Sequence, residues 1–498
     1  MVNQFSKFFR LFCVKTVICS FFLAIVSMTF GIVGETLAYE TKKTSTGTSN
    51  WPQFRGPSGS GLGTGQPPTS WNVETGENIQ WKTEIPGLGH SSPIVFGEKI
   101  FLTTAVSENV DDAALETGWM GGSGTSTKDT GSWTWKVLCL DHKSGNILWE
   151  KEVAQGKPKM ERHLKASHAN CTPATDGKHL LAFFGSEGLY CLDYEGNLLW
   201  EKDFGILRAG SYRSDVSWGF SSSPIIHDGK AIIQCDCTNT GFIAILDIQN
   251  GKELMRIERN EVAAWSTPTI VEYSGKTQIV CNGYQEMAGY DFQTGERLWT
   301  LSGGGDIPVP TPLYAHNLIF ITNGHSRSPL YVISPDAKGD LTPNKGPTER
   351  QKTKGEEQSK DMKQGPPLKE RPKNELPEGL AWWQETGGSY MPTPLIVGDL
   401  LYLCNDNGIL SVIDAKTGNQ IYKKRVSRKS GTYSASAVAT EGNVYFGNEQ
   451  GSVTVIETGE KYKLVATNEM NEVLMATPAI FGDRILIRTV GHLYSIGQ

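Results

Sequence analysis

The sequence predicts an all-β fold, an eight-bladed β-propeller of four-stranded antiparallel blades, from three observations. A short motif recurs eight times along the 498-residue chain, and a turn-forming motif falls between its copies. The chain also holds 55 glycines and 13 tryptophans, a composition typical of an all-β protein with many turns. The net charge of −6 argues against nucleic-acid binding as a first choice, and the aromatic content excludes a disordered chain.

The first motif is a Ser or Thr before proline, an apolar run, a turn that usually contains Gly, and a second apolar run. Most copies are 41–51 residues apart, and the two spacings near 80 each contain an insertion. A period of about 42 residues built from short strands is that of a propeller blade. The copies are centred on Pro93, Pro173, Pro224, Pro268, Pro312, Pro394, Ala437 and Pro478.

The second motif is an apolar pair followed by Asp, a turn that ends in Gly, and an apolar residue followed by Trp. The Asp satisfies backbone groups in the turn, and the Gly supplies a positive φ. We expect the Trp to cover the seam to the neighbouring blade. The predicted blade-turn residues are Asp141, Gly145, Trp149, Asp193, Gly196, Trp200, Asp291, Gly295, Trp299, Asp414 and Gly418.

The last repeat ends where its Asp-turn-Trp segment should follow. The missing segment is found at the other end of the chain, in ETGENIQW, which carries Gly76 and Trp81. A strand near Ile79–Ile85 is therefore predicted to complete the last blade. Such closure joins the ring without a covalent bond and removes open sheet edges.

The N-terminus has the pattern of a secretory signal peptide. Lys7, Arg10 and Lys15 precede an uncharged apolar stretch at 16–33, and small residues follow at Thr36-Leu37-Ala38. We predict a signal peptide at 1–38 and a single propeller domain at 39–498. An uncleaved anchor is the alternative, because the apolar stretch approaches membrane-spanning length.

Two insertions interrupt the repeats. Residues 105–133 are rich in Gly and Ser and are predicted to form a mobile loop within the first blade. Residues 336–378 carry many charges of both signs, several prolines and almost no apolar residues, which predicts a disordered linker. A segment that binds a partner is the functional alternative for 336–378.

The opening motif Trp51-Pro52-Gln53-Phe54-Arg55-Gly56-Pro57 and the TGxxxW turns resemble the quinoprotein, or pyrroloquinoline-quinone (PQQ) type, propeller family. The resemblance covers about 450 residues and is nearest to exported bacterial PQQ-binding-like β-propeller repeat proteins. Some members of this superfamily are quinone-dependent alcohol or glucose dehydrogenases. Others have no cofactor, such as the assembly lipoprotein that helps to insert outer-membrane proteins. The resemblance therefore implies the fold more strongly than an activity.

Two hypotheses of function follow from this resemblance. The first is an exported binding or scaffold protein of the periplasm or cell envelope, with an envelope protein or a small molecule at its channel face. It has no nucleic-acid partner and no transmembrane segment after signal cleavage, and we expect a monomer. The alternative is a quinone-dependent alcohol or sugar dehydrogenase that uses PQQ with Ca²⁺. The chain lacks the adjacent cysteines and the Cys-x-x-Cys-His motif of some dehydrogenases, so the first is preferred and enzymatic activity stays open.

In this architecture the ligand face is built by the loops that lead into the innermost strands. Side chains that stack and donate hydrogen bonds there would hold a planar, polar ligand. The alternative is that they plug the channel mouth and satisfy one another. The predicted channel-mouth residues are His90, His168, Asn170, Trp218, Trp265, Asp306, Tyr390 and Tyr433.

No catalytic residue and no metal site is predicted. His163 and His168 are five residues apart and have no accompanying carboxylate pattern, which argues against a metal site. Arg208 and Arg213 flank a short polar loop, where they either grip a carboxylate-rich ligand or stay solvated.

Overall fold

A computed structural model describes residues 50–119, 121–122, 124–210, 216–238, 240–325, 328–343 and 376–498. Residues Thr48–Gln498 form one compact unit. The predicted signal peptide at 1–38 lies outside the described residues. Within the described ranges, no helix has the length and apolar character needed to cross a bilayer.

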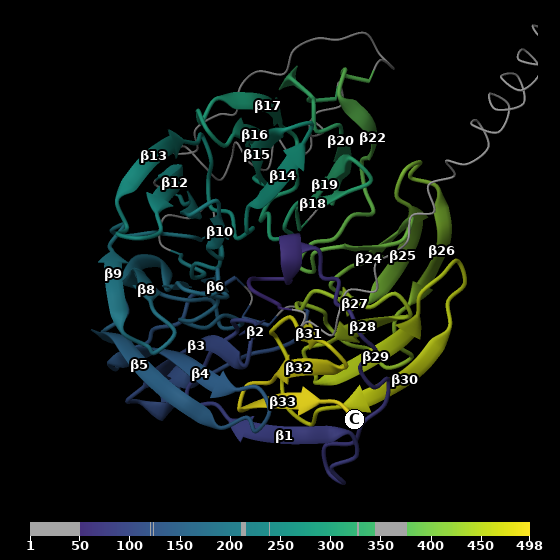
Figure 1. The fold of residues 1–498 in the computed structure, drawn as a ribbon. Coiled ribbons are helices and arrows are strands. Elements are labelled where there is room, and N and C mark those ends of the chain that lie inside the picture. The colour runs from purple at the N-terminus through teal and green to yellow at the C-terminus, as the bar shows by residue number, and fades with distance from the viewer. Residues whose placement is uncertain are drawn as a thin grey trace, which may run out of the picture. The chain divides into compact units, whose positions relative to one another are not determined.

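The predicted eight-bladed propeller is confirmed. Eight sheets surround a central axis, as Figure 1 shows, and the innermost strands of neighbouring blades contact one another. Blade 1 contains β2 (Ile94–Phe96), β3 (Lys99–Ser107), β4 (Trp133–Asp141) and β5 (Ile147–Gly156); blade 2 contains β6 (Ala174–Thr175), β7 (Leu180–Phe183), β8 (Leu189–Leu192) and β9 (Leu198–Lys202); blade 3 contains β10 (Ile225–His227), β11 (Lys230–Asp236), β12 (Gly241–Asp247) and β13 (Glu253–Glu258); blade 4 contains β14 (Thr269–Tyr273), β15 (Lys276–Cys281), β16 (Met287–Asp291) and β17 (Arg297–Leu301).

The second half of the ring repeats this order, with the outermost strand of the last blade taken from the start of the chain. Three short 3₁₀ helices are η1 (Pro57–Gly59), η2 (Val110–Ala113) and η3 (Gly185–Glu187). Blade 5 contains β18 (Leu313–Ala315), β19 (Leu318–Thr322), β20 (Leu330–Ile333) and β22 (Leu380–Gln384); blade 6 contains β23 (Leu395–Val397), β24 (Leu400–Cys404), β25 (Ile409–Asp414) and β26 (Gln420–Arg425); blade 7 contains β27 (Val438–Ala439), β28 (Asn443–Gly447), β29 (Ser452–Glu457) and β30 (Leu464–Glu469); blade 8 contains β31 (Ala479–Phe481), β32 (Arg484–Arg488), β33 (His492–Ile496) and β1 (Ile79–Glu84).

The ring closes as the sequence predicts. Strand β1 pairs antiparallel with β33, with Lys82 opposite Tyr494 and Glu84 opposite His492. One blade differs from the others. In blade 4, β21 (Gly339–Asp340) pairs parallel with the outer strand β17 and makes a five-stranded sheet. The apolar side chain of Leu341 next to β21 is fully buried, which anchors this extra strand.

The two insertions differ in how their ends join the strands of their blades. In blade 1, β3 extends to Ser107 and β4 begins at Trp133, so the strands themselves enter both ends of the 105–133 segment. In blade 5, the 336–378 segment falls between β20 and β22, and its residues 344–375 lie outside the described residues. The described start of that segment supplies β21.

The blade-turn residues join each blade to the next. Trp149 of β5 donates its Nε1–H to the Tyr194 carbonyl of blade 2 at 3.0 Å. Its ring lies so close to Gly196 that a Cβ there would come within 3.0 Å of the indole. The same cross-blade indole bonds run from Trp81 to His142, from Trp200 to Ile248 and from Trp382 to Ala415. In the turns, the carboxylates of Asp141, Asp193, Asp291 and Asp414 accept backbone N–H groups, and Gly145, Gly196, Gly295 and Gly418 have φ of 73, 85, 72 and 75°.

Trp299 reaches its neighbouring blade indirectly. Its Nε1–H donates to Gln278 Oε1 at 3.0 Å, and Gln278 Nε2 donates to the Pro335 carbonyl at 2.7 Å. Pro335 follows β20 of blade 5, so Gln278 relays the contact across the seam. Trp299 is 1% exposed, and it packs in a cluster with Leu341 and Leu380.

Candidate functional site

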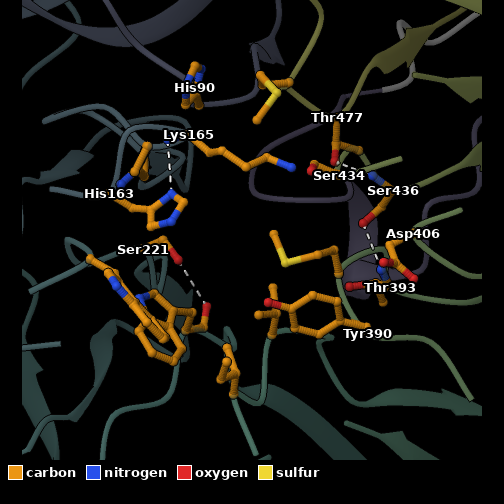
Figure 2. A pocket seen from close by; sticks show the side chains of 18 of the residues that line it. His90, His163, Lys165, Ser221, Tyr390, Thr393, Asp406, Ser434, Ser436 and Thr477 are labelled. Atoms are coloured by element: carbon orange, nitrogen blue, oxygen red, sulfur yellow. Dashed lines mark hydrogen bonds between the residues drawn. The ribbon is translucent and has the colours of Figure 1, made fainter. Parts of the chain in front are cut away.

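The central channel holds a chamber of about 450 Å³ on the side where the loops enter the innermost strands. Figure 2 shows its wall, with Tyr390 and Asp406 on one side and His163 on the other. The structure brings five of the predicted channel-mouth residues to this wall: His90, Asn170, Trp218, Trp265 and Tyr390. His168, Asp306 and Tyr433 are not among its lining residues.

These three residues have other contacts. His168 Nε2 lies 2.7 Å from Asp129 Oδ2, and its ring packs edge-on against Trp133. Tyr433 is 2% exposed and donates its backbone N–H to the Asp406 carbonyl. The Asp306 carbonyl accepts the backbone N–H of His325 at 2.8 Å. His168 and Tyr433 therefore support the residues that surround the chamber.

Segment 51–61, which begins with the Trp51-Pro52-Gln53-Phe54-Arg55-Gly56-Pro57 motif, contributes Phe54 to the chamber, and we call this segment the floor. Trp51 pairs with Val95 of blade 1, and the Pro52 carbonyl accepts the Thr175 N–H of blade 2. Helix η1 of this segment contacts β14 of blade 4. In Figure 1 this purple start of the described chain lies at the centre of the ring. Phe54, in the middle of the segment, lines the chamber.

Arg55 fixes the floor to the opposite half of the ring. Its side chain donates to the carbonyls of Pro394 at 2.8 Å and Ala437 at 3.1 Å, in blades 6 and 7, and to Gly59 and Ser60 of its own segment. The residue is fully buried, and burial lowers the pKa of its guanidinium to about 9. It stays charged at neutral pH, with carbonyl oxygens in place of water.

Two segments, 108–132 and 157–168, cover the other end of the chamber; we call them the cap. Arg162 organises the cap from its interior, where its side chain is fully buried. It donates to the carbonyls of Asp112, Ala114 and Ala166 and pairs with Asp129 at 3.1 Å. Within the segment predicted to be a mobile loop, Asp112, Ala114 and Asp129 thus contact the buried Arg162, whereas Val110 and Trp119 are 85% and 64% exposed.

A second contact ties the cap to the far side of the ring. Lys165 Nζ lies 2.5 Å from Glu449 Oε1 of blade 7, and Gly118 donates its N–H to the other Glu449 oxygen at 2.7 Å. The Glu449 side chain is fully buried, and Ser434 also donates to it. Figure 2 shows Lys165 extended across the chamber toward Ser434. Residues of both the cap and the floor thus line the chamber.

The Ser or Thr of each blade motif forms a ring around the chamber. Along this ring, the backbone N–H of one residue donates to the side-chain hydroxyl in the next blade at 2.9–3.0 Å. These bonds run from Ser92 to Thr172, Thr172 to Ser223, Ser223 to Thr267, Thr311 to Thr393, Thr393 to Ser436 and Ser436 to Thr477. At these six seams the hydroxyl takes part in the blade-to-blade contact, which accounts for the Ser or Thr at the start of the motif.

Aromatic faces form much of the accessible wall. Trp218 and Trp265 stack with centroids 5.7 Å apart and an interplanar angle of 30°. Their Nε1–H groups donate to the carbonyls of Gly124 and Gly219, so they present ring surface rather than donors to the chamber. His163 meets Trp218 edge-on at 6.0 Å. This wall suits an apolar or cationic group better than a hydrogen-bond acceptor.

Two of the three histidines that line the chamber, His90 and His163, are neutral at physiological pH. Burial lowers the pKa of His90 to about 3, helped by the positive charges of Arg488 and Arg162. Burial likewise lowers the pKa of His163 to about 4, helped by Lys165. His163 Nδ1 accepts the backbone N–H of Lys165 at 3.0 Å, a bond that requires the unprotonated nitrogen.

The described lining residues do not fit PQQ with Ca²⁺. PQQ carries several carboxylates, but the lysine of the wall, Lys165, is already neutralised by Glu449. Ca²⁺ takes six to eight oxygen ligands, several of them carboxylates. The described part of the chain brings no three acidic, His or Cys side chains together at one point.

Several residues of the site were missed from the sequence. Phe54 and Arg55 belong to the opening motif at 51–57, but the sequence did not indicate that this motif contributes to the chamber. Lys165, Asp406 and Glu449 gave no signal, because each follows a different strand, and the pair of Lys165 with Glu449 forms only when the ring closes. Arg208 lines a separate surface pocket with Lys128 and Lys157, whereas Arg213 lies outside the described residues.

Comparison with known proteins agrees with this architecture. A family model described as outer membrane protein assembly factor BamB matches residues 134–340 and 378–496. The BamB of Burkholderia pseudomallei (strain K96243) is 30% identical over 105 residues, which is 21% of this chain and 26% of that protein. The matched stretch thus spans about a quarter of the length of this curated relative.

Solved structures share the fold. BamB from Moraxella catarrhalis superposes with a TM-score of 0.50 at 11% identity, covering 84% of this chain and 99% of that one. A europium-containing methanol dehydrogenase superposes with a TM-score of 0.56 at 10% identity, covering 89% and 90%. At these identities the likeness concerns the fold, which assembly factors and dehydrogenases have in common. The family match over most of the ring is what places the protein: the chain belongs to the family of PQQ-like repeat propellers described as outer membrane protein assembly factor BamB.

Proposed function

We propose that this chain is an exported binding or scaffold protein of the cell envelope, which holds a partner protein or small ligand at the capped face of its channel. The observation that carries the proposal is the chamber itself, which is lined by Phe54 of the floor and by residues of the cap and remains open to solvent at Trp119. Its wall combines stacked aromatic rings with a few polar groups, as is usual for binding sites. The family membership supports a place in the periplasm, in contact with envelope proteins.

The dehydrogenase alternative has less support. The fold likeness to a methanol dehydrogenase stands at 10% identity, and the described lining residues do not fit the quinone. It is tested by adding PQQ and Ca²⁺ to the purified protein and following dye-linked alcohol oxidation. Turnover above that of a boiled control would replace the binding proposal with the enzymatic one.

Capture of partners from envelope extracts tests the binding role. Trp119 lines the chamber and is 64% exposed, so W119A alters the channel face at a residue with few contacts to lose. Leu254 on the outer strand β13 is 50% exposed and provides a control, L254A, away from the chamber. We expect W119A to lose a partner that the wild type and L254A both retain. If only L254A fails to capture the partner, the partner binds at the outer rim of the propeller and the proposed binding at the channel face is wrong.

A further inference from the structure

The charges around the chamber leave one carboxylate without a counterion. Asp406 lines the chamber from the turn between β24 and β25, and its side chain has no hydrogen bond or ion pair with a described residue. Its position is fixed by the backbone, because its carbonyl accepts the Tyr433 N–H at 2.8 Å. The lysine of the same wall is already paired with buried Glu449. Among the described lining residues, the uncompensated charge is therefore negative.

Positive charges near the chamber do not reach this carboxylate. Arg55 and Arg488 are both buried and neither lines the chamber. Arg55 donates to two carbonyls within the floor and to two of blades 6 and 7, and Arg488 Nη1 donates to Ser91 and to the Thr103 carbonyl at the seam of blades 8 and 1. The charges of Arg488 and Arg162 disfavour a cation near His90, so the carboxylate of Asp406, in blade 6, provides the more attractive side of the chamber.

Aromatic and thioether groups line the same chamber. The Tyr390 ring meets the His325 ring edge-on at 5.0 Å. Burial raises the pKa of Tyr390, and the charges of Asp306 and Asp406 raise it further, so the phenol stays neutral and close to both carboxylates. Met391 and Met475 also line the chamber, and methionine adapts to the shape of an apolar group. The Trp218–Trp265 pair faces the chamber from blades 3 and 4.

We propose that the chamber binds a small organic ammonium ion, with its charge beside Asp406 and the Tyr390 ring and its apolar part against Met391. This proposal rests on the proposed function and specifies the ligand of the same chamber. A carboxylate next to aromatic faces is how proteins recognise alkylammonium groups, and desolvation strengthens the attraction. The volume of about 450 Å³ admits one small molecule.

A pair of probes that differ only in charge tests the proposal. Choline and its uncharged carbon isostere dimethylbutanol are titrated into the purified protein by calorimetry, with tryptophan fluorescence as a second readout. We expect choline to bind at least about tenfold more tightly, which corresponds to the strength of a buried cation–aromatic contact with a carboxylate nearby. D406N removes the charge at nearly constant shape and should bring the two probes to within about twofold of each other.

A matched control separates the chamber from the overall charge. Asp399 also follows a strand of blade 6, but its carboxylate pairs with Lys416 at 2.8 Å outside the chamber. D399N should keep the full preference for choline. Equal binding of the two probes, an unchanged preference in D406N, or no binding of choline would each overturn the ammonium proposal. If choline does not bind, the ammonium proposal fails by itself. Binding of dimethylbutanol, or partner capture that depends on Trp119, would in that case still support the proposed function.

Discussion

Lys165 and Glu449 meet across the channel at 2.5 Å, although 284 positions separate them in the sequence. Lys165 belongs to the cap and Glu449 to blade 7. The same buried carboxylate accepts the backbone N–H of Gly118 from the other cap segment. The Glu449 side chain thus holds both segments of the cap. The position of the cap therefore depends on the ion pair between Glu449 and Lys165.

Removing the lysine should therefore destabilise the cap strongly. K165M leaves the fully buried Glu449 carboxylate without its counterion, which should cost about 3 kcal/mol in the free energy of unfolding. K165M/E449Q removes both charges and should recover part of that loss. Lys429 pairs with Glu469 at an exposed site, so K429M should cost less than about 1 kcal/mol. Urea unfolding measures all three variants, and a K165M loss no larger than that of K429M would contradict the account.

Acidification should loosen the cap through His163. The folded-state pKa of His163 is lowered to about 4, chiefly by burial, from an ordinary value near 6.5. The folded protein therefore binds this proton less readily than the unfolded chain, so its stability is present above pH 6.5 and is lost as the pH falls toward 4. Allowing for the partial exposure of the ring, we expect a loss of about 2 kcal/mol over this window.

Replacing the histidine provides the check. H163Q carries no titrating group, so its unfolding free energy should change less than that of the wild type between pH 7.5 and 4.5. Hydrogen exchange at residues 116–118 and 163–166 should rise in the wild type over the same range. Parallel pH profiles for the two proteins would assign the acid sensitivity to other groups, such as Asp129 or His168.

The fold was predictable because a blade is a local unit that the chain repeats. Asp141, Gly145 and Trp149 lie within nine residues, and their spacing carries both the turn and the bond to the next blade. The closing strand was predictable for the same reason, because Trp81 repeats the pattern at the far end of the chain. The extra strand β21 was not, because its two residues carry no periodic signal.

The site was predictable only in part. His90, Asn170, Trp218, Trp265 and Tyr390 line the chamber because they precede innermost strands, a place that the repeat defines. His168 satisfies the same rule, but its ring is drawn to Asp129 of the cap, which no repeat predicts. Contacts such as Lys165 with Glu449 join segments of different blades, so no pattern along the sequence pairs them.

The floor of the chamber should depend on the planar guanidinium of Arg55. R55K keeps the charge but cannot bond the Pro394 and Ala437 carbonyls together with those of Gly59 and Ser60. We expect a loss of about 2–3 kcal/mol in unfolding free energy, with faster hydrogen exchange at Gly61 and Gly63. Arg256 bonds Glu253 on the outer strand β13 at a partly exposed site, so R256K should lose less than about 1 kcal/mol. Equal losses of unfolding free energy in R55K and R256K would show that the floor does not need the planar guanidinium of Arg55.

The seam between blades 2 and 3 offers a test of the repeated Trp–Gly contact. Gly251 and Gly229 are both in blade 3 and have nearly the same backbone, with φ of 68 and 66°. A Cβ on Gly251 would lie 2.6 Å from the Trp200 ring, whereas one on Gly229 would meet no atom within 4 Å. G229A should cost about 1 kcal/mol for its positive φ alone, and G251A about 1–3 kcal/mol more because the ring must shift.

The double variant W200A/G251A identifies the source of that difference. With the indole removed, the added methyl group has space, so the two losses should sum to more than the loss in the double variant. The same unfolding experiment on W200A/G229A should give additive losses, since Gly229 does not touch the ring. Additive losses in both pairs would mean that Gly251 is required only for its φ. A coupling confined to Gly251 would show that glycine ends this turn motif for two physical reasons, its backbone and the tryptophan of the neighbouring blade.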